Sequence, residues 1–284
     1  MTRPIRSQSR GPCCDFRDCD SPSWHSPSWD SQAGTAAAVI PVAGTSACEV
    51  ETPEGPGRWH LDLAENPRAM VALGHGAGGG VTAMDLALLA ATLPAHGISV
   101  ARFEQPWRLA GRKVATPPPR LDIAWLAAVD ELHRRPELAG LPLVVGGRSA
   151  GARVACRTAN TLGAVGTLCL AFPLHLPGRP EKSRLPELLT PTVPRLVLQG
   201  TRDSFGSADE LIAALAAGST GPAEQSIEVV PVPGADHSFK TLARAEFRPA
   251  DVRALVLENA LRLVETVSSG MSAEANRPAG ARPD

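Results

Sequence analysis

Short runs of consecutive apolar residues alternate along the chain with longer segments in which apolar positions recur every three or four residues. A short apolar run is typical of a strand buried on both faces, and the longer period indicates a helix that packs on one side. The runs predict strands at Ala69–Leu73, Ile98–Phe103, Leu143–Gly147, Val165–Leu170, Arg195–Gln199 and Ile227–Val232. The longer segments predict helices at Thr82–Leu93, Arg120–Arg134, Ala150–Leu162, Ser207–Ala217 and Pro249–Val267. Repeated units of this kind predict an α/β fold, a mainly parallel sheet with helices on both faces.

The two ends of the chain lack this pattern. Residues 1–35 are dominated by Ser, Pro, Arg and Asp, and residues 268–284 are also polar and without a period. Such composition is typical of disorder, so we expect one folded domain at 36–267 between two disordered segments. An antiparallel strand pair is expected early in that domain, between residues 47 and 63. The predicted strand that ends at Leu170 and the one that begins at Arg195 are joined by residues 171–194 alone, a segment too short for a large cap domain.

Composition narrows the function classes. The 284 residues include 28 basic and 29 acidic side chains, a balance that argues against a nucleic-acid partner. No run approaches the roughly 18 apolar residues of a membrane helix, and residues 1–30 lack the apolar block of a secretory signal. We therefore expect a cytoplasmic protein without a membrane partner. The seven histidines show no ligand spacing with acids or thiols, so no metal or other cofactor is expected. Oligomeric state is not readable.

A G-x-S-x-G motif, Gly147-Arg148-Ser149-Ala150-Gly151, stands between a predicted strand and a predicted helix. This is the setting of a nucleophile elbow, a sharp turn that exposes a serine hydroxyl. Such a turn leaves no room for side chains two residues away, which explains small residues at 147 and 151. The alternative is a glycine-rich turn with an idle serine.

A glycine-rich segment at 74–80, GHGAGGG, follows another predicted strand. Its main-chain N–H groups at Gly76 and Ala77, together with the N–H of Ala150, could hold the oxyanion of a tetrahedral intermediate. A nucleotide-phosphate loop is the alternative. No Gly-Lys-Ser/Thr follows, and a lone G-x-G-x-x-G reading is a weak sign of a dinucleotide site.

An aspartate and a histidine complete the set. Asp203 follows the predicted strand that ends at Gln199, and His237 follows the one that ends at Val232. Ser149, Asp203 and His237 thus occur in the order of the α/β-hydrolase triad, each just beyond a strand. Asp236 competes as the acid, but a residue adjacent to His237 in sequence would have difficulty facing the imidazole ring.

The sequence resembles the α/β-hydrolase superfamily, and within it a small dienelactone-hydrolase-like group related to a vertebrate testis-expressed protein. The resemblance is carried by LGHGAGGG, ARFEQPWRLAGRKVATPPPRLD, VVGGRSAGARVA, LAFPLHLPGRPEKSR, LVLQGTRDSFG and GADHSFK, within residues 73–240. The resemblance implies that Ser149 is the nucleophile and that Asp203 and His237 are its partners. It also implies that Ala150 and the Gly76–Ala77 turn supply the oxyanion donors.

These residues permit a serine hydrolase that cleaves a small ester, thioester or lactone through an acyl-enzyme. Trp107, Arg148 and His175 are the candidate substrate contacts. Arg148, with the basic residues between 102 and 120, would suit an anionic acyl group, although a solvated basic loop is an alternative. Trp107 could equally pack in the core, and His175 could equally lie on the surface. The rival function is a non-catalytic interaction protein that retains the fold.

Overall fold

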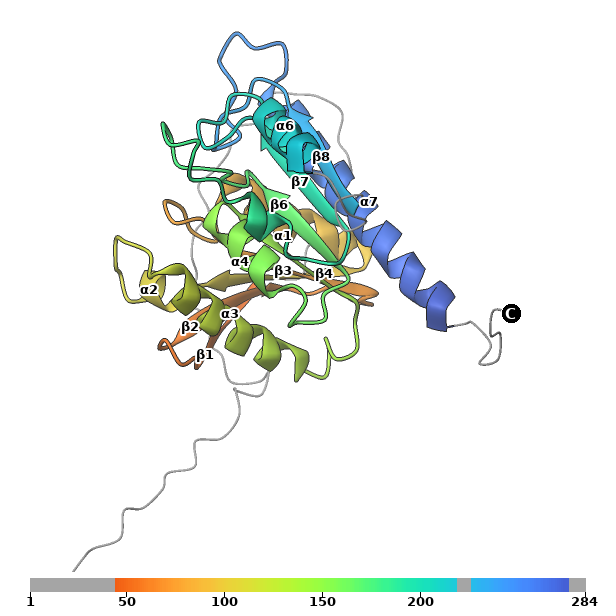
Figure 1. The fold of residues 1–284 in the computed structure, drawn as a ribbon. Helices are drawn as coiled ribbons and strands as arrows, with labels where there is room; N and C mark the ends of the chain where they lie inside the picture. The colour runs from red at the N-terminus through yellow and green to blue at the C-terminus, as the bar shows by residue number, and fades with distance from the viewer. Residues whose placement is uncertain (1–43, 219–225, 276–284) are drawn as a thin grey trace, which may run out of the picture. The chain divides into compact units, whose positions relative to one another are not determined.

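The computed structural model describes residues 44–218 and 226–275. The chain separates into Met1–Pro41, which lies outside the described residues, and Val42–Asp284, to which everything below refers. Within the described residues an 8-stranded sheet has the order β1-β2-β4-β3-β5-β6-β7-β8 (Figure 1). The strands are β1 (Ser46–Val50), β2 (Gly57–Asp62), β3 (Ala69–Gly74), β4 (Ile98–Glu104), β5 (Leu143–Arg148), β6 (Gly166–Leu170), β7 (Arg195–Gly200) and β8 (Ile227–Val232).

The helices alternate with these strands. They are α1 (Met84–Thr92), α2 (Pro106–Leu109), α3 (Pro118–His133), α4 (Ala150–Thr158), α5 (Leu185–Leu188), α6 (Ala208–Gly218) and α7 (Pro249–Ala275), with a 3-10 turn, η1, at Leu93–His96. Strands β3 to β8 are parallel to one another where they pair, and β1 and β2 form the antiparallel edge. The predicted mainly parallel sheet and its early antiparallel pair are therefore confirmed.

Helix α7 differs from its prediction at the end. It continues beyond residue 267 to Ala275, whereas the sequence predicted its end at Val267. Residues 268–275 read SSGMSAEA, and most of these residue types are tolerated in a helix that has already formed, so polarity alone does not end it. The predicted disordered segment 1–35 and the rest of the tail, 276–284, lie outside the described residues.

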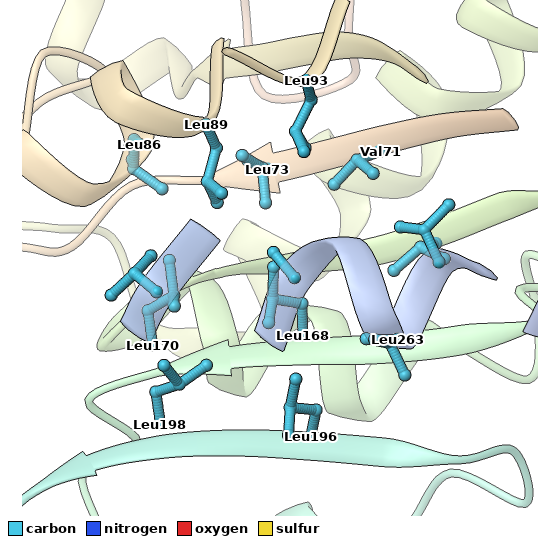
Figure 2. Close-up of a cluster of buried hydrophobic side chains, with 14 of the residues drawn as sticks. Val71, Leu73, Leu86, Leu89, Leu93, Leu168, Leu170, Leu196, Leu198 and Leu263 are labelled. Carbon is cyan, nitrogen blue, oxygen red and sulfur yellow. The ribbon is translucent and has the colours of Figure 1, made fainter. Parts of the chain in front are cut away.

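The two faces of the sheet bury different helices. Because side chains alternate along a strand, Val71 and Leu73 of β3 pack toward α1 and α7, as Figure 2 shows, whereas Met70 and Ala72 pack toward α3 and α4. A third cluster joins α4 to α5 and α6 over β6 and β7. Helices cover both faces, and the parallel strands β3 to β7 are accordingly buried along nearly their whole length, as their continuous apolar runs predicted, whereas the edge strand β8 is only partly buried.

The connection between β6 and β7 contains only the short helix α5 and an isolated bridge between Leu176 and Arg179. It adds no cap domain over the sheet, in agreement with the short sequence between the two strands. Across residues 44–218 and 226–275, none of the helices has the length and apolar character to span a bilayer. A cytoplasmic location stays a prediction.

Candidate active site

Ser149 occupies a sharp turn between β5 and α4. Its backbone has φ +52° and ψ −109°, a conformation that residues other than glycine rarely adopt. Strain of this kind costs about 1–3 kcal/mol and persists only where the surroundings enforce it. Here the N–H of Ser149 donates to the carbonyl of Leu170 at 3.0 Å, and the first turn of α4 starts at the next residue. The elbow predicted from the motif is present.

The glycines of the motif allow this elbow to touch the neighbouring strand. A Cβ atom added at Gly147 or Gly151 would collide with the main chain of Gly74 in β3, and Gly147 itself has φ +153°. A Cβ on Gly76 would lie 3.4 Å from the Cβ of Ser149. The glycine-rich loop after β3 therefore lies directly beside the serine, as an oxyanion role requires.

The structure brings the three sequence-predicted polar side chains into one hydrogen-bonded chain. The hydroxyl of Ser149 lies 2.9 Å from Nε2 of His237, and Nδ1 of His237 lies 2.8 Å from Oδ2 of Asp203. Each residue comes from the turn after a different parallel strand, β5, β7 or β8, and these turns meet at one edge of the sheet. With Nδ1–H donating to the carboxylate, Nε2 has a lone pair for the serine proton.

Asp203 is buried at 3 % exposure and fixed by two further donors. The main-chain N–H of Phe205 donates to Oδ1 at 2.8 Å, and Nε2 of Gln199 donates to Oδ2 at 3.1 Å. The ring of Phe205 stacks on the ring of His237 with 4.2 Å between centroids. These contacts hold both members of the pair in one orientation. Gln199 and Phe205 were not singled out from the sequence, because neither type marks such a role by itself.

The competing acid, Asp236, has a different task. Its Oδ1 accepts the main-chain N–H groups of Ser238 and Lys240, at 2.7 Å and 3.0 Å. The side chain of Asp236 therefore closes the turn that carries His237. Both of these hydrogen bonds are to main-chain N–H groups, and neither is to the imidazole. The geometry agrees with the choice of Asp203 as the partner of His237.

Arg148 makes several contacts within the protein. Its guanidinium donates to the carboxylate of Asp85 and to the main-chain carbonyl of His237, and it lies 5.3 Å from the ring centre of Phe239. The side chains of Arg148 and Asp85 are 10 % and 0 % exposed. The charge of Arg148 is therefore balanced within the protein, and a contact with an anionic acyl group stays a prediction. Arg148 also ties the elbow to the turn that carries the histidine.

His75 shapes the glycine-rich loop. Its Nδ1 lies 2.9 Å from the carbonyl of Gly76, and its Nε2 accepts the main-chain N–H of Gln105 at 3.2 Å. Burial lowers the pKa of His75, which keeps the ring neutral and able to make both bonds. The ring thus orients the carbonyl of Gly76 within the turn that contains the predicted oxyanion donors.

The other two candidate substrate contacts differ in their surroundings. Trp107 of α2 is 3 % exposed and lines a small cavity together with Ala77 and Ala150. His175 is buried, its Nδ1 lies 2.9 Å from the carbonyl of Leu176, and its main-chain N–H donates to the carbonyl of Phe205. These bonds give His175 a packing function beside the Asp203 turn, and a contact with substrate stays a prediction.

Within the described residues, no group of three or more His, Cys, Asp or Glu side chains is arranged to hold a metal ion. The site is instead defined by a serine at an elbow, a histidine with a carboxylate behind it, and a glycine-rich loop, all at the carboxyl edge of a parallel sheet. That combination defines the α/β-hydrolase fold and its usual site. The sequence matches the alpha/beta hydrolase domain family over residues 67–265, and the chain belongs to that family.

Solved structures resemble the chain in the same way. A serine hydrolase without a lid from Xanthomonas campestris is 22% identical, with a TM-score of 0.58 over 80% of this chain and 97% of that one. A dienelactone hydrolase from Anabaena variabilis is 19% identical, with a TM-score of 0.58 over 78% and 97%. An esterase from Pyrococcus furiosus is 17% identical, with a TM-score of 0.57 over 77% and 90%. At these identities the likeness establishes the fold.

No curated protein sequence matches the chain. The relation to a vertebrate testis-expressed protein stays a prediction.

Proposed function

We propose that the protein is a serine hydrolase that cleaves a small carboxylic ester, thioester or lactone through an acyl-enzyme on Ser149. The observation that carries the proposal is the chain of contacts from Ser149 through His237 to Asp203, at 2.9 Å and 2.8 Å, with the serine on a strained elbow. Names of structural neighbours support it, since they include a serine hydrolase, an esterase and a dienelactone hydrolase.

The first half-reaction forms the acyl-enzyme. Oγ of Ser149 attacks the acyl carbonyl carbon while its proton passes to Nε2 of His237. Asp203 holds the imidazole in the tautomer that accepts this proton and stabilises the imidazolium. The negative oxygen of the tetrahedral intermediate is held by main-chain N–H groups of Ala150 and the Gly76–Ala77 turn, and the positive end of α4 adds to this stabilisation.

The second half-reaction releases the acid. His237 gives its proton to the leaving alcohol or thiol, and the Ser149 ester remains. A water molecule then loses a proton to His237 and attacks the acyl carbon, which frees the carboxylic acid and restores the serine. Every proton is transferred by one histidine, so the reaction requires no metal and no redox partner.

Labelling with a fluorophosphonate tests the proposal. The wild-type protein should be labelled at Ser149, and Ser149→Ala should abolish labelling and lower ester turnover by about 10⁴-fold or more. Ser183→Ala is the matched control, because Ser183 is an exposed serine on the β6–β7 connection, and this variant should be labelled normally. Labelling that persists in Ser149→Ala would overturn the assignment.

A further inference from the structure

A small cavity opens beside the predicted oxyanion turn. Its volume is about 10 Å³, the space of roughly one water-sized group. Ala77, which is exposed, and Ala150, which is half-buried, lie on its rim. Most of the rest of its wall is formed by buried residues, among them Trp107, Leu121, Trp125 and Val154. An acyl group whose carbonyl oxygen is held at Ala77 and Ala150 would have its carbon 2 next to this cavity.

Three residues that line this cavity carry a buried polar atom without a hydrogen-bond partner among the described residues. They are Gln105 at Oε1, Trp107 at Nε1 and Trp125 at Nε1. The other amide atom of Gln105, Nε2, donates to the carbonyl of Leu121 at 3.3 Å, which fixes Oε1 as the unpaired acceptor. Unpaired buried polar groups are costly, and these two donors and one acceptor belong to residues that all line one small space, which favours a polar group at the end of an otherwise apolar occupant. A hydroxyl group both accepts and donates, and it matches this set.

Trp107 also lines a larger hollow. The hollow has a volume of about 250 Å³ and is lined by α2 and the β1–β2 turn, including Pro106, Leu109 and Gly55. Gln105 and Trp107 line both spaces. The indole therefore limits how far a chain can extend from the serine, although room exists on its other side.

We propose that this cavity is the acyl subsite, and that it selects a two-carbon acyl group that carries a hydroxyl on carbon 2. The inference rests on the hydrolase function proposed above and specifies its substrate class. The hydroxyl accepts a hydrogen bond from the indole N–H of Trp107 and donates to Oε1 of Gln105. The size of the cavity excludes longer chains, and Trp107 is the residue that sets the limit.

Paired aryl esters and two substitutions at one position test the two parts separately. Trp107→Phe keeps an aromatic wall and removes one N–H donor, so kcat/KM for the glycolate ester relative to the acetate ester should fall about 3- to 10-fold, the worth of one hydrogen bond. Trp107→Leu lowers the wall, so kcat/KM for the octanoate ester relative to acetate should rise about 10-fold or more. Intrinsic ester reactivity cancels, because each ratio is compared with the same ratio in the wild type.

Trp59→Phe is the matched control. Trp59 is buried and its ring centre lies 5.9 Å from that of Trp125, but its Nε1 donates to the carbonyl of Ala128 and it does not line the cavity. Both ester ratios should stay at their wild-type values in this variant. If Trp107→Leu does not fold, the glycolate-to-acetate ratio of Trp107→Phe still decides the proposal.

The outcomes separate the inference from the function on which it rests. Wild-type protein that is labelled at Ser149 but hydrolyses octanoate as well as acetate, or whose glycolate-to-acetate ratio is unchanged in Trp107→Phe, overturns the acyl subsite and leaves the hydrolase. Wild-type protein that is neither labelled nor active on any ester overturns the proposed function itself. Loss of the glycolate preference in Trp107→Phe with normal labelling supports both.

Discussion

Replacing Asp203 by asparagine changes one atom of the hydrogen-bonded chain. In the wild type, all three groups that approach this carboxylate are donors: the N–H of Phe205 at Oδ1, and Nε2 of Gln199 and Nδ1 of His237 at Oδ2. Asparagine offers one acceptor oxygen and one NH₂ group. Whichever way the amide is turned, its NH₂ group faces a donor at a site that is almost fully buried.

The two orientations have different consequences. If NH₂ takes the place of Oδ2, it donates to Nδ1 of His237 and forces the proton onto Nε2, which can then no longer accept the proton of Ser149. If NH₂ takes the place of Oδ1, the tautomer is preserved, but the N–H of Phe205 is left unpaired at a cost of about 1–3 kcal/mol. The carboxylate charge that stabilises the imidazolium is lost in both. The same substitution in a well-studied serine protease lowers turnover about 10⁴-fold, or about 5 kcal/mol in the barrier, and we expect a similar loss here.

Asp236→Asn is the control for this substitution. Only Oδ1 of Asp236 accepts the N–H groups of Ser238 and Lys240, and the asparagine oxygen can replace it. Turnover of a short-chain aryl ester should therefore stay within about 3-fold of wild type, since the turn keeps both bonds. Circular dichroism should show both variants folded. An Asp203→Asn variant with near-normal turnover, or an inactive but folded Asp236→Asn variant, would refute the assignment of the carboxylate.

Two further predictions concern groups that hold the site. Arg148→Met should lower the free energy of unfolding, measured by urea titration, by about 3–5 kcal/mol, because it leaves the carboxylate of Asp85 buried without its counter-ion. A loss below about 1 kcal/mol would contradict the pairing of Arg148 with Asp85. Burial lowers the pKa of His75 in the folded protein, so below about pH 6.5 the unfolded chain binds a proton at this residue more readily than the folded chain does. The free energy of unfolding should therefore be greatest above about pH 6.5 and should decline as the pH falls below that value. His75→Asn removes this titration, and its melting temperature should fall less than that of wild type between pH 7.5 and 5.5; an equal fall in both would exclude His75 as a source of acid sensitivity.

Local signals in the sequence were enough to locate the principal site residues. Each of Ser149, Asp203 and His237 lies just past a run of apolar residues that forms a parallel strand. Parallel strands bring their carboxyl ends to one edge, so strand recognition alone placed these three residues near one another. The glycines at 147 and 151 were readable for the same reason, since their small size reflects one local turn.

The function of Arg148 could not be predicted in this way. A basic residue inside an elbow motif reads as exposed unless its counter-ion is known, and that counter-ion, Asp85, lies at the start of α1. The same limit applies to Gln199, whose amide reaches Asp203 only because the turn after β7 folds back on its own strand. Such contacts depend on tertiary packing, and neither residue type carries a signal of it. Helix α7 was underestimated because a polar segment shows no apolar face, whether it is helical or not.

Arg148 also explains how a strained serine and a histidine on another turn keep their alignment. The strand order places β6 and β7 between the strand that leads to Ser149 and the strand that leads to His237, so sheet hydrogen bonds do not connect the two turns directly. Arg148 supplies that connection. It is adjacent to Ser149 in sequence, and its guanidinium donates a hydrogen bond to the main-chain carbonyl of His237. Its second bond, to Asp85, anchors it to α1 and prevents it from rotating with the turn. The elbow and the main chain of His237 are therefore both tied to the same guanidinium, itself held to α1, which keeps the serine hydroxyl and the imidazole aligned.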